Sequence, residues 1–237
     1  MSFTTLTRRA TNRMTSVPAI RTPSRARANV LWVLVATLGL SLVSAAPDAL
    51  ATASPEETVH ATADQALVIL ADKSLSKTQK TAKLTTLLDG VSDFETTSKL
   101  VLARGWKDLS EPQQKEFQGL LRDYLIARYR DRVDDYAGQT VEITGGREEA
   151  RGDYTVHTRI KSSTTAQPIL VDYRLRKDPA GTWRVIDVIG EGLSIVSNLR
   201  SQFQSILSHG GPEKLMQTLR EKIETGEAAK DGEKDKL

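Results

Sequence analysis

The side chains that could carry out chemistry are few and scattered along the chain. The three histidines, His60, His157 and His209, have no acid and nucleophile near them in sequence that would suggest a catalytic triad, and we interpret each as a surface residue. The short motifs of serine hydrolases, zinc hydrolases and phosphate-binding loops do not occur. Cysteine is absent, which excludes disulfides, thiolate metal ligands and cysteine nucleophiles. The sequence therefore predicts no catalytic residues, no metal and no cofactor.

Two carboxylates are the remaining candidates for acid–base chemistry. Asp172 and Asp187 lie on neighbouring strand-like stretches and could in principle pair, but Arg174 and Arg184 beside them favour structural ion pairs. Asp187 interrupts an otherwise apolar run, and a buried carboxylate must be hydrogen-bonded or paired to be tolerated. We expect backbone N–H groups at the start of the following helix to be its partners.

The segment from Gly190 to Ser194 could present backbone N–H groups to a phosphate at the start of a helix. Glu191 would repel such a phosphate. A tight turn between a strand and a helix is the favoured interpretation.

The first 53 residues have the form of a secretory signal peptide. They carry six arginines and one acidic residue, then an apolar run over 30–43, then small residues that suit a cleavage site. The alternative is an uncleaved anchor helix, but the apolar run is shorter than the roughly 20 residues that span a membrane. Because the positive charge of the whole chain, +3, lies in this segment, the remainder is slightly acidic, and nucleic acid is not an expected partner.

The remainder is predicted to form one domain over 54–223, followed by a disordered charged tail over 224–237. Helical spacing of apolar residues begins at a capped start at Ser54 and recurs in segments up to Tyr136. The charged face of the 111–136 helix is interpreted as a solvated face with local ion pairs. After the strands, helical spacing returns from Leu193 and is interrupted at Gly210–Pro212.

Between these helices the apolar period changes to two over four stretches joined by short links. One face of each predicted strand is apolar and the other polar, as in an antiparallel sheet covered on one side. The predicted fold class is α+β: a curved four-stranded antiparallel sheet wrapped by N- and C-terminal helices (NTF2-like), enclosing an apolar cavity.

The apolar face of this sheet and the helices that cover it contain the candidate site. Composition alone is compatible with an ordinary packed core as well as with a ligand cavity. The candidate lining residues are Phe117, Leu121, Tyr124, Leu125, Val141, Ile143, Tyr154, Val156, Ile169, Val171, Tyr173, Val188, Leu193, Val196, Leu199 and Phe203.

A set of residues at fixed spacing resembles the MlaC family, also called toluene-tolerance proteins. The resemblance covers roughly 56–222 and is most specific in its last block, which contains an Asn, an Arg-x-Gln-Phe group and a Glu-Gly pair. The matching positions are Asp93, Phe94, Trp106, Gln114, Phe117, Tyr129, 171–175, 183–188 and 191–203. The family usually has Tyr at the position of Leu199 and a Leu-Gly pair at 103–105, so this chain departs from it there.

The resemblance implies a monomeric periplasmic lipid carrier without enzymatic activity. Family members hold the acyl chains of a phospholipid inside a cavity. They move it between an outer-membrane lipoprotein–porin complex and an inner-membrane ABC transporter with an MCE-domain subunit. A branch associated with hopanoid synthesis leaves a hopanoid as an alternative ligand. An enzyme acting on an acyl or isoprenoid substrate is the second hypothesis, with Asp187, Tyr154 and Tyr173 as its only plausible catalytic residues.

Overall fold

The computed structural model describes residues 53–162 and 167–234, all of which belong to one unit over 45–237. The predicted signal peptide lies outside the described residues except for Ala53, and so do the last three residues of the predicted tail. Within the described part of the chain, no helix has the length and apolar character needed to cross a membrane.

The sheet consists of the four predicted strands and one short addition. β1 (Thr140–Glu148), β2 (Tyr154–Lys161), β3 (Ile169–Lys177) and β4 (Trp183–Gly190) pair in sequence order, each antiparallel to the next. A two-residue strand, β5 (Leu193–Ser194), continues the order beside β4. The sequence placed Leu193 in the following helix. Glu191 and Gly192 instead have φ angles of 48° and 80°, which turn the chain back against β4.

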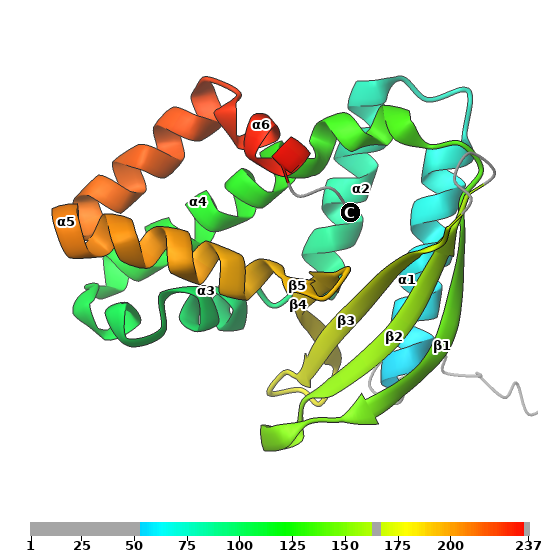
Figure 1. Ribbon diagram of the computed structural model, residues 1–237, viewed down its shortest axis with the longest axis horizontal. Coiled ribbons are helices and arrows are strands. Elements are labelled where there is room, and N and C mark those ends of the chain that lie inside the picture. Colours follow the sequence, from blue (N-terminus) through cyan, green and yellow to red (C-terminus); the bar gives the residue numbers. More distant parts are fainter. Residues whose placement is uncertain (1–52, 163–166, 235–237) are drawn as a thin grey trace, which may run out of the picture. The chain divides into compact units, whose positions relative to one another are not determined.

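Two irregularities bend the sheet. The pairing register shifts between Ile143 and Gly145 on β1, and again between Arg174 and Leu175 on β3. Bulges of this kind increase the local twist of a strand. The curvature that results is visible in Figure 1, where the sheet bends around α1.

The two N-terminal helices begin at matching caps. α1 (Pro55–Ala71) follows a capping box between Ser54 and Glu57, and α2 (Lys77–Val91) follows one between Ser76 and Gln79. α1 packs on β1 and β2, whereas α2 packs on α1 and contacts β4. These helices therefore cover part of the apolar face of the sheet.

The central helices form the other side of the molecule. α3 (Phe94–Leu102) leads through the 3₁₀ helix η2 (Ala103–Asp108) into α4 (Glu111–Tyr129), and α4 packs on α3 and on the C-terminal helices. α4 was expected to continue to Tyr136, but the charged segment after it is the 3₁₀ helix η3 (Arg130–Asp135).

The charged face of α4 is not merely solvated. The guanidinium of Arg122 donates to both carboxylate oxygens of Asp89 on α2, at 2.6 and 2.7 Å. This ion pair joins two helices.

α5 (Ile195–Glu224) consists of two helical segments, as the Gly-Gly-Pro sequence predicted. Gly211 has φ 70° and ψ −175°, and Pro212 opens the second segment. A proline is well tolerated in the first turn of a helix, where its missing N–H has no intrahelical partner.

The prediction of a disordered tail over 224–237 is wrong for most of that segment. Residues Glu227–Lys234 form α6, which packs on α4 and α5. The prediction failed because it relied on the scarcity of large apolar side chains. A single small residue, Ala228, is fully buried against the helical core and attaches α6.

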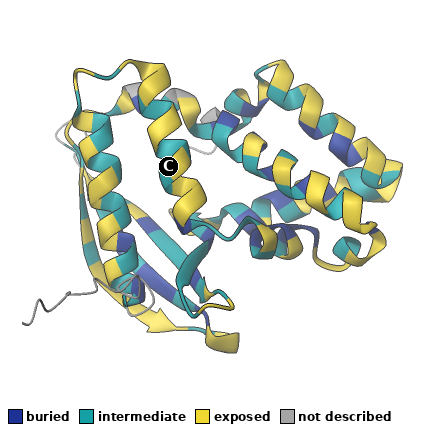
Figure 2. Cartoon of the chain, turned by 180° about the vertical axis from the view of Figure 1, so that it is seen from behind, coloured by how far each residue is buried: buried dark blue, intermediate teal, exposed yellow. Residues whose placement is uncertain are grey.

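Buried residues occur both on the helices and on the sheet (Figure 2). Most of the buried apolar side chains belong to two separate clusters. The helical cluster lies among α3, α4, α5 and α6. The sheet cluster consists of Val59, Val156 and Leu175, with partly buried residues around it. The surface between the predicted sheet face and the helices is therefore not one continuous packed core.

Candidate functional site

The strand register places the predicted apolar residues on one face of the sheet, as expected. Val156 of β2 lies opposite Tyr173 of β3, and Tyr173 lies opposite Val188 of β4. On antiparallel strands, directly opposed residues point to the same side. The same rule places Val141, Ile143, Tyr154, Ile169 and Val171 on that face, which we call the inner face.

One end of the inner face is packed under α1. Val59 of α1 is buried with Val156 and Leu175, and the rings of Tyr154 and Trp183 meet edge to face at 6.2 Å beside them. The hydroxyl of Tyr154 donates a short hydrogen bond to Glu56 in the first turn of α1. This end of the sheet is an ordinary core.

The other end of the inner face is different. Val141, Ile160, Ile169 and Val188 are half-buried, and none of them belongs to the sheet cluster or the helical cluster. Val141, Ile160 and Ile169 lie side by side across β1, β2 and β3 and form a patch, which we call the open end of the inner face. Val188 lies beside Tyr173, further along the sheet. Aliphatic side chains that point inward and still keep exposed surface can be covered by an apolar ligand.

Tyr173 lies between these two ends. Its side chain is half-buried, while burial alone raises the pKa of its hydroxyl above the ordinary value.

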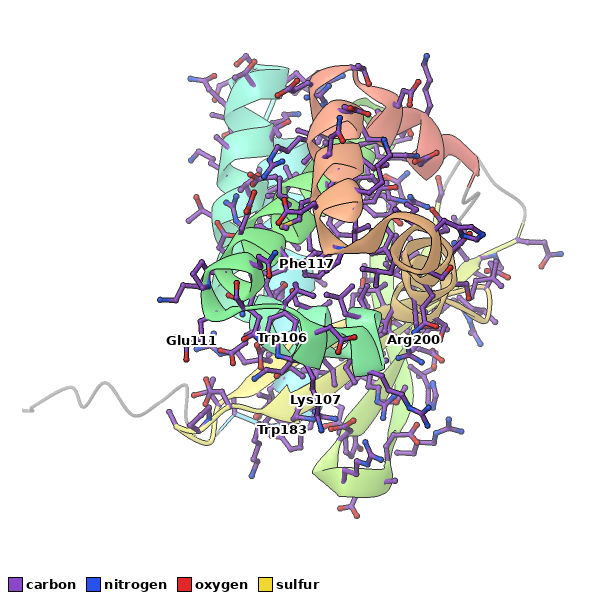
Figure 3. The ribbon with its side chains drawn as sticks, turned by 90° about the vertical axis from the view of Figure 1, so that its left-hand side faces the viewer. Trp106, Lys107, Glu111, Phe117, Trp183 and Arg200 are labelled. Carbon is purple, nitrogen blue, oxygen red and sulfur yellow. The ribbon has the colours of Figure 1, made fainter. Side chains whose placement is uncertain are left out.

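The predicted residues on the helices form a core of their own. Phe203 contacts the rings of Phe117 and Tyr124 edge to face, at 6.1 and 6.2 Å between centroids. Leu121, Val196 and Leu199 are buried in the same helical cluster, and Leu125 is half-buried against it. The structure therefore does not bring these residues together with the sheet residues in one cluster. Phe117 and Arg200 can be located on the helical side in Figure 3, and Trp183 on the sheet.

Leu193 is the predicted lining residue that the structure places elsewhere. It lies on β5 with 68% of its surface exposed. Sequence reasoning also left Ile160 out of the candidate list, although it continues the alternation of β2 and lies opposite Ile169. The alternation was the signal that could have included it.

The joint between β4 and α5 is fixed by Asp187. Its carboxylate accepts hydrogen bonds from the Ser194 hydroxyl at 2.6 Å and from the Val196 N–H at 3.1 Å. The Val196 N–H is an expected helix-start partner, whereas the Ser194 hydroxyl was not predicted. Burial raises the pKa of Asp187, and the hydrogen bonds from Ser194 and Val196 oppose that rise without cancelling it.

The Val196 N–H at this helix start is bonded to Asp187. The Gly190–Ser194 segment forms the tight turn between strand and helix that the sequence favoured over a phosphate site. Its Glu191 carboxylate accepts a hydrogen bond from the Leu170 N–H at 2.7 Å.

Other residues of the family pattern also fix joints between elements. Asp93 caps α3 by accepting from the Thr96 N–H at 2.8 Å. The guanidinium of Arg200 on α5 donates two hydrogen bonds to the carbonyl of Leu100, at 2.9 and 2.7 Å. The residues that carry the resemblance thus include some that hold the helices against each other and against the sheet.

The structure does not assemble the catalytic group that the enzyme hypothesis requires. Tyr154 and Tyr173 lie on the inner face, whereas Asp187 lies opposite Arg174 and points to the outer face. Asp172 pairs with His157 at 2.9 Å and not with Asp187. Among the described residues, no group of three or more histidines and acids is arranged to hold a metal.

A depression of about 540 Å³ lies away from the inner face. It is formed where α2 meets α3, beside the turn between β3 and β4, and is lined among others by Asp93, Glu95 and Arg184. Arg184 donates to Asp178 at 2.9 Å and to the carbonyl of Gly90. None of the predicted lining residues belongs to it.

The fold and the site define a class: an α+β protein in which helices cover one apolar sheet face and leave part of that face uncovered. The family model described as MlaC protein matches residues 60–221, more than half of the chain. The chain belongs to the MlaC family.

Two relatives support this assignment. The intermembrane phospholipid transport system binding protein MlaC of Haemophilus influenzae is 22% identical over 191 residues, which cover 78% of this chain and 89% of the relative. A phospholipid-binding protein of Ralstonia solanacearum, solved in complex with a phospholipid, has a TM-score of 0.65 and 27% identity. That match covers 74% of this chain and 99% of the solved chain.

Proposed function

We propose that this protein is a periplasmic carrier that binds the acyl chains of a phospholipid and moves the lipid between the outer and inner membranes. The observation that carries the proposal is the open end of the inner face, Val141, Ile160 and Ile169, whose aliphatic surface the protein's own buried clusters do not take up. The similarity to a structure solved with a bound phospholipid supports the choice of ligand.

The chemistry of this surface suits hydrocarbon. Its members are aliphatic and carry no side-chain hydrogen-bonding group, so they provide nothing that would recognise a polar substrate. Burial of hydrocarbon contributes about 0.8 kcal/mol per methylene. A lipid with two acyl chains would therefore almost never leave the protein for bulk water. Transfer requires docking to a partner at each membrane.

The choice of partners is supported by the family and by the name of the Haemophilus relative, which belongs to an intermembrane phospholipid transport system. We propose an inner-membrane ABC transporter with an MCE-domain subunit and an outer-membrane lipoprotein–porin complex. Export to the periplasm agrees with the signal-like N-terminal 53 residues. Binding and release involve no covalent step, so the proposed role is that of a carrier and not of an enzyme.

Adjacent residues on β3 give a sharp test. Ile169 is half-buried on the inner face, whereas Leu170 points the other way and is 50% exposed. Ile169→Asp places a charge at the open end and should reduce loading of a fluorescent phospholipid from vesicles at least about tenfold. Leu170→Asp makes a comparable change on the outer face and should leave loading unchanged. Equal loading of both variants would show that the lipid does not bind at the open end of the inner face.

A further inference from the structure

The C-terminal helix α6 lies beyond the residues that match the family model, which end at 221. It packs on α4 and α5 (Figure 1). Ala228 is its fully buried contact. Its second attachment is polar and involves Asp231, three residues further along. Neither attachment belongs to the inner face of the sheet.

Asp231 is placed among cationic and hydroxyl groups of α4 and α5. The Tyr124 hydroxyl donates to its carboxylate at 3.0 Å, and the Lys222 ammonium donates to the same oxygen at 2.5 Å. One turn further along α4, the Arg128 guanidinium donates to the Tyr124 hydroxyl at 2.8 Å. We call Tyr124, Arg128 and Lys222 the anion site.

The electrostatics of the anion site favour a negative charge. Burial opposes ionisation of Asp231, but hydrogen bonds from Lys222 and Tyr124, together with the charges of Lys222 and Arg128, hold the pKa of its carboxyl below the ordinary value. Arg128 is only 3% exposed, so its positive charge is largely withdrawn from water. A buried guanidinium is tolerated only where anionic or hydrogen-bonding groups accompany it.

We propose that the anion site binds a phosphate group and that Asp231 of α6 occupies it as an internal competitor. The Lys222 ammonium and the Tyr124 hydroxyl both donate to the Asp231 carboxylate, and the Arg128 guanidinium donates to that hydroxyl. An ammonium and a hydroxyl with a guanidinium behind them suit phosphate as well as carboxylate. The site is not sealed, because the side chains of Lys222 and Asp231 keep 28% and 15% of their surface exposed. A ligand can therefore reach it from solvent once α6 moves.

α6 has the properties of a displaceable segment. It has 8 residues, and a helix this short is not stable in water without tertiary contacts. It is joined to α5 through Gly226, whose φ of 75° separates the two helices. The phosphate could come from the head group of a carried lipid, in which case the inference rests on the proposed function, or from free phosphate, in which case it does not.

The test measures binding of inorganic phosphate to the full chain by calorimetry. Asp231→Asn removes the competing charge at nearly constant shape and should bind phosphate at least about tenfold more tightly than the unmodified protein. Glu227→Gln makes the same change at an exposed position of α6 and should have no effect. Adding Lys222→Met to Asp231→Asn should abolish the gain.

A second variant undocks α6 without touching the charges. Ala228→Gln places a long polar side chain in a fully buried position and should also increase phosphate affinity. If neither Asp231→Asn nor Ala228→Gln binds phosphate more tightly than Glu227→Gln, the group is a structural clamp only and the proposal is overturned.

The source of the phosphate is decided by lipid loading. If Asp231→Asn takes up more phosphatidylglycerol but no more diacylglycerol from vesicles, the site receives a lipid head group. If neither lipid changes while inorganic phosphate still binds, the ligand is free phosphate. Should no variant carry any lipid, the proposed function fails, but the calorimetry still decides whether the anion site exists.

Discussion

The carboxylate of Asp187, near the end of β4, accepts a 2.6 Å hydrogen bond from the hydroxyl of Ser194, the residue that caps α5. The same carboxylate accepts the Val196 N–H. One side chain of the sheet therefore fixes where the longest helix begins. The apolar residues of β4 and of the start of α5, on either side of this joint, are therefore positioned by a polar contact.

Replacing this carboxylate should loosen the joint. Asp187→Ala leaves the Ser194 hydroxyl and the Val196 N–H without their acceptor and should lower the free energy of unfolding by about 1–2 kcal/mol. Because burial raises the pKa of Asp187 in the folded state, its contribution is largest below the unfolded pKa and falls as pH rises through the folded pKa. Urea unfolding from pH 3 to pH 8 checks this. A difference between the two proteins that grew with pH would contradict it.

Asp153 should show the opposite pH dependence. Its carboxylate is buried between Arg176, at 2.5 Å, and Arg174, at 2.7 Å. Burial opposes ionisation, but the hydrogen bonds and charges of the two arginines outweigh it, and the pKa of Asp153 lies below the ordinary value. Its contribution to stability is thus present above the unfolded pKa and lost as pH falls through the folded pKa.

Asp153→Asn should therefore cost about 3 kcal/mol at neutral pH and much less in acid. Glu148→Gln, at an exposed position of β1, is the matched control and should change stability little. Thermal unfolding at neutral and acidic pH measures both. A cost that stayed constant down to pH 2 would show that the arginines do not stabilise the charged form.

Phe203 should be a residue of the folded core and not only of a ligand surface. It is 3% exposed and contacts Phe117 and Tyr124. Phe203→Ala should lower the free energy of unfolding of lipid-free protein by about 3–5 kcal/mol. Gln204→Ala, on the exposed side of α5, should not. A small loss for Phe203→Ala in lipid-free protein would place this ring in a ligand cavity instead.

Gly192 tests whether the turn between β4 and β5 moves during transfer. Its φ of 80° strains any other residue, although no atom within 4 Å would meet an added Cβ, so Gly192→Ala should cost about 1 kcal/mol. If the turn opens when lipid passes to a partner, the variant should also transfer lipid more slowly between vesicles. Gly90→Ala, in a helix with open space around it, is the control. Unchanged transfer would locate the opening elsewhere.

The strands and most helices could be predicted because their signals are local. Alternation placed Val156 and Tyr173 on one face, and the cap at Ser54 marked the start of the first helix. The fifth strand could not be predicted, because Leu193 has the apolar character of the following helix. Only its pairing with Gly190 places it in the sheet.

The candidate site was harder to predict because packing between distant segments decides it. Phe117 and Ile169 are both apolar residues with the right period, yet one is fully buried among helices and the other is half-exposed on the inner face. The α6 contact depends on Ala228 meeting residues far away in sequence, and composition gave no sign of it.

The account depends most directly on whether the protein carries a lipid. Denaturing mass spectrometry of an organic extract of the purified protein measures this. The account predicts about one phospholipid per chain in the unmodified protein and a strong reduction in Ile169→Asp. One hopanoid per chain would support the carrier function with a hopanoid as the ligand in place of a phospholipid. An extract free of lipid from folded, exported protein would contradict the account.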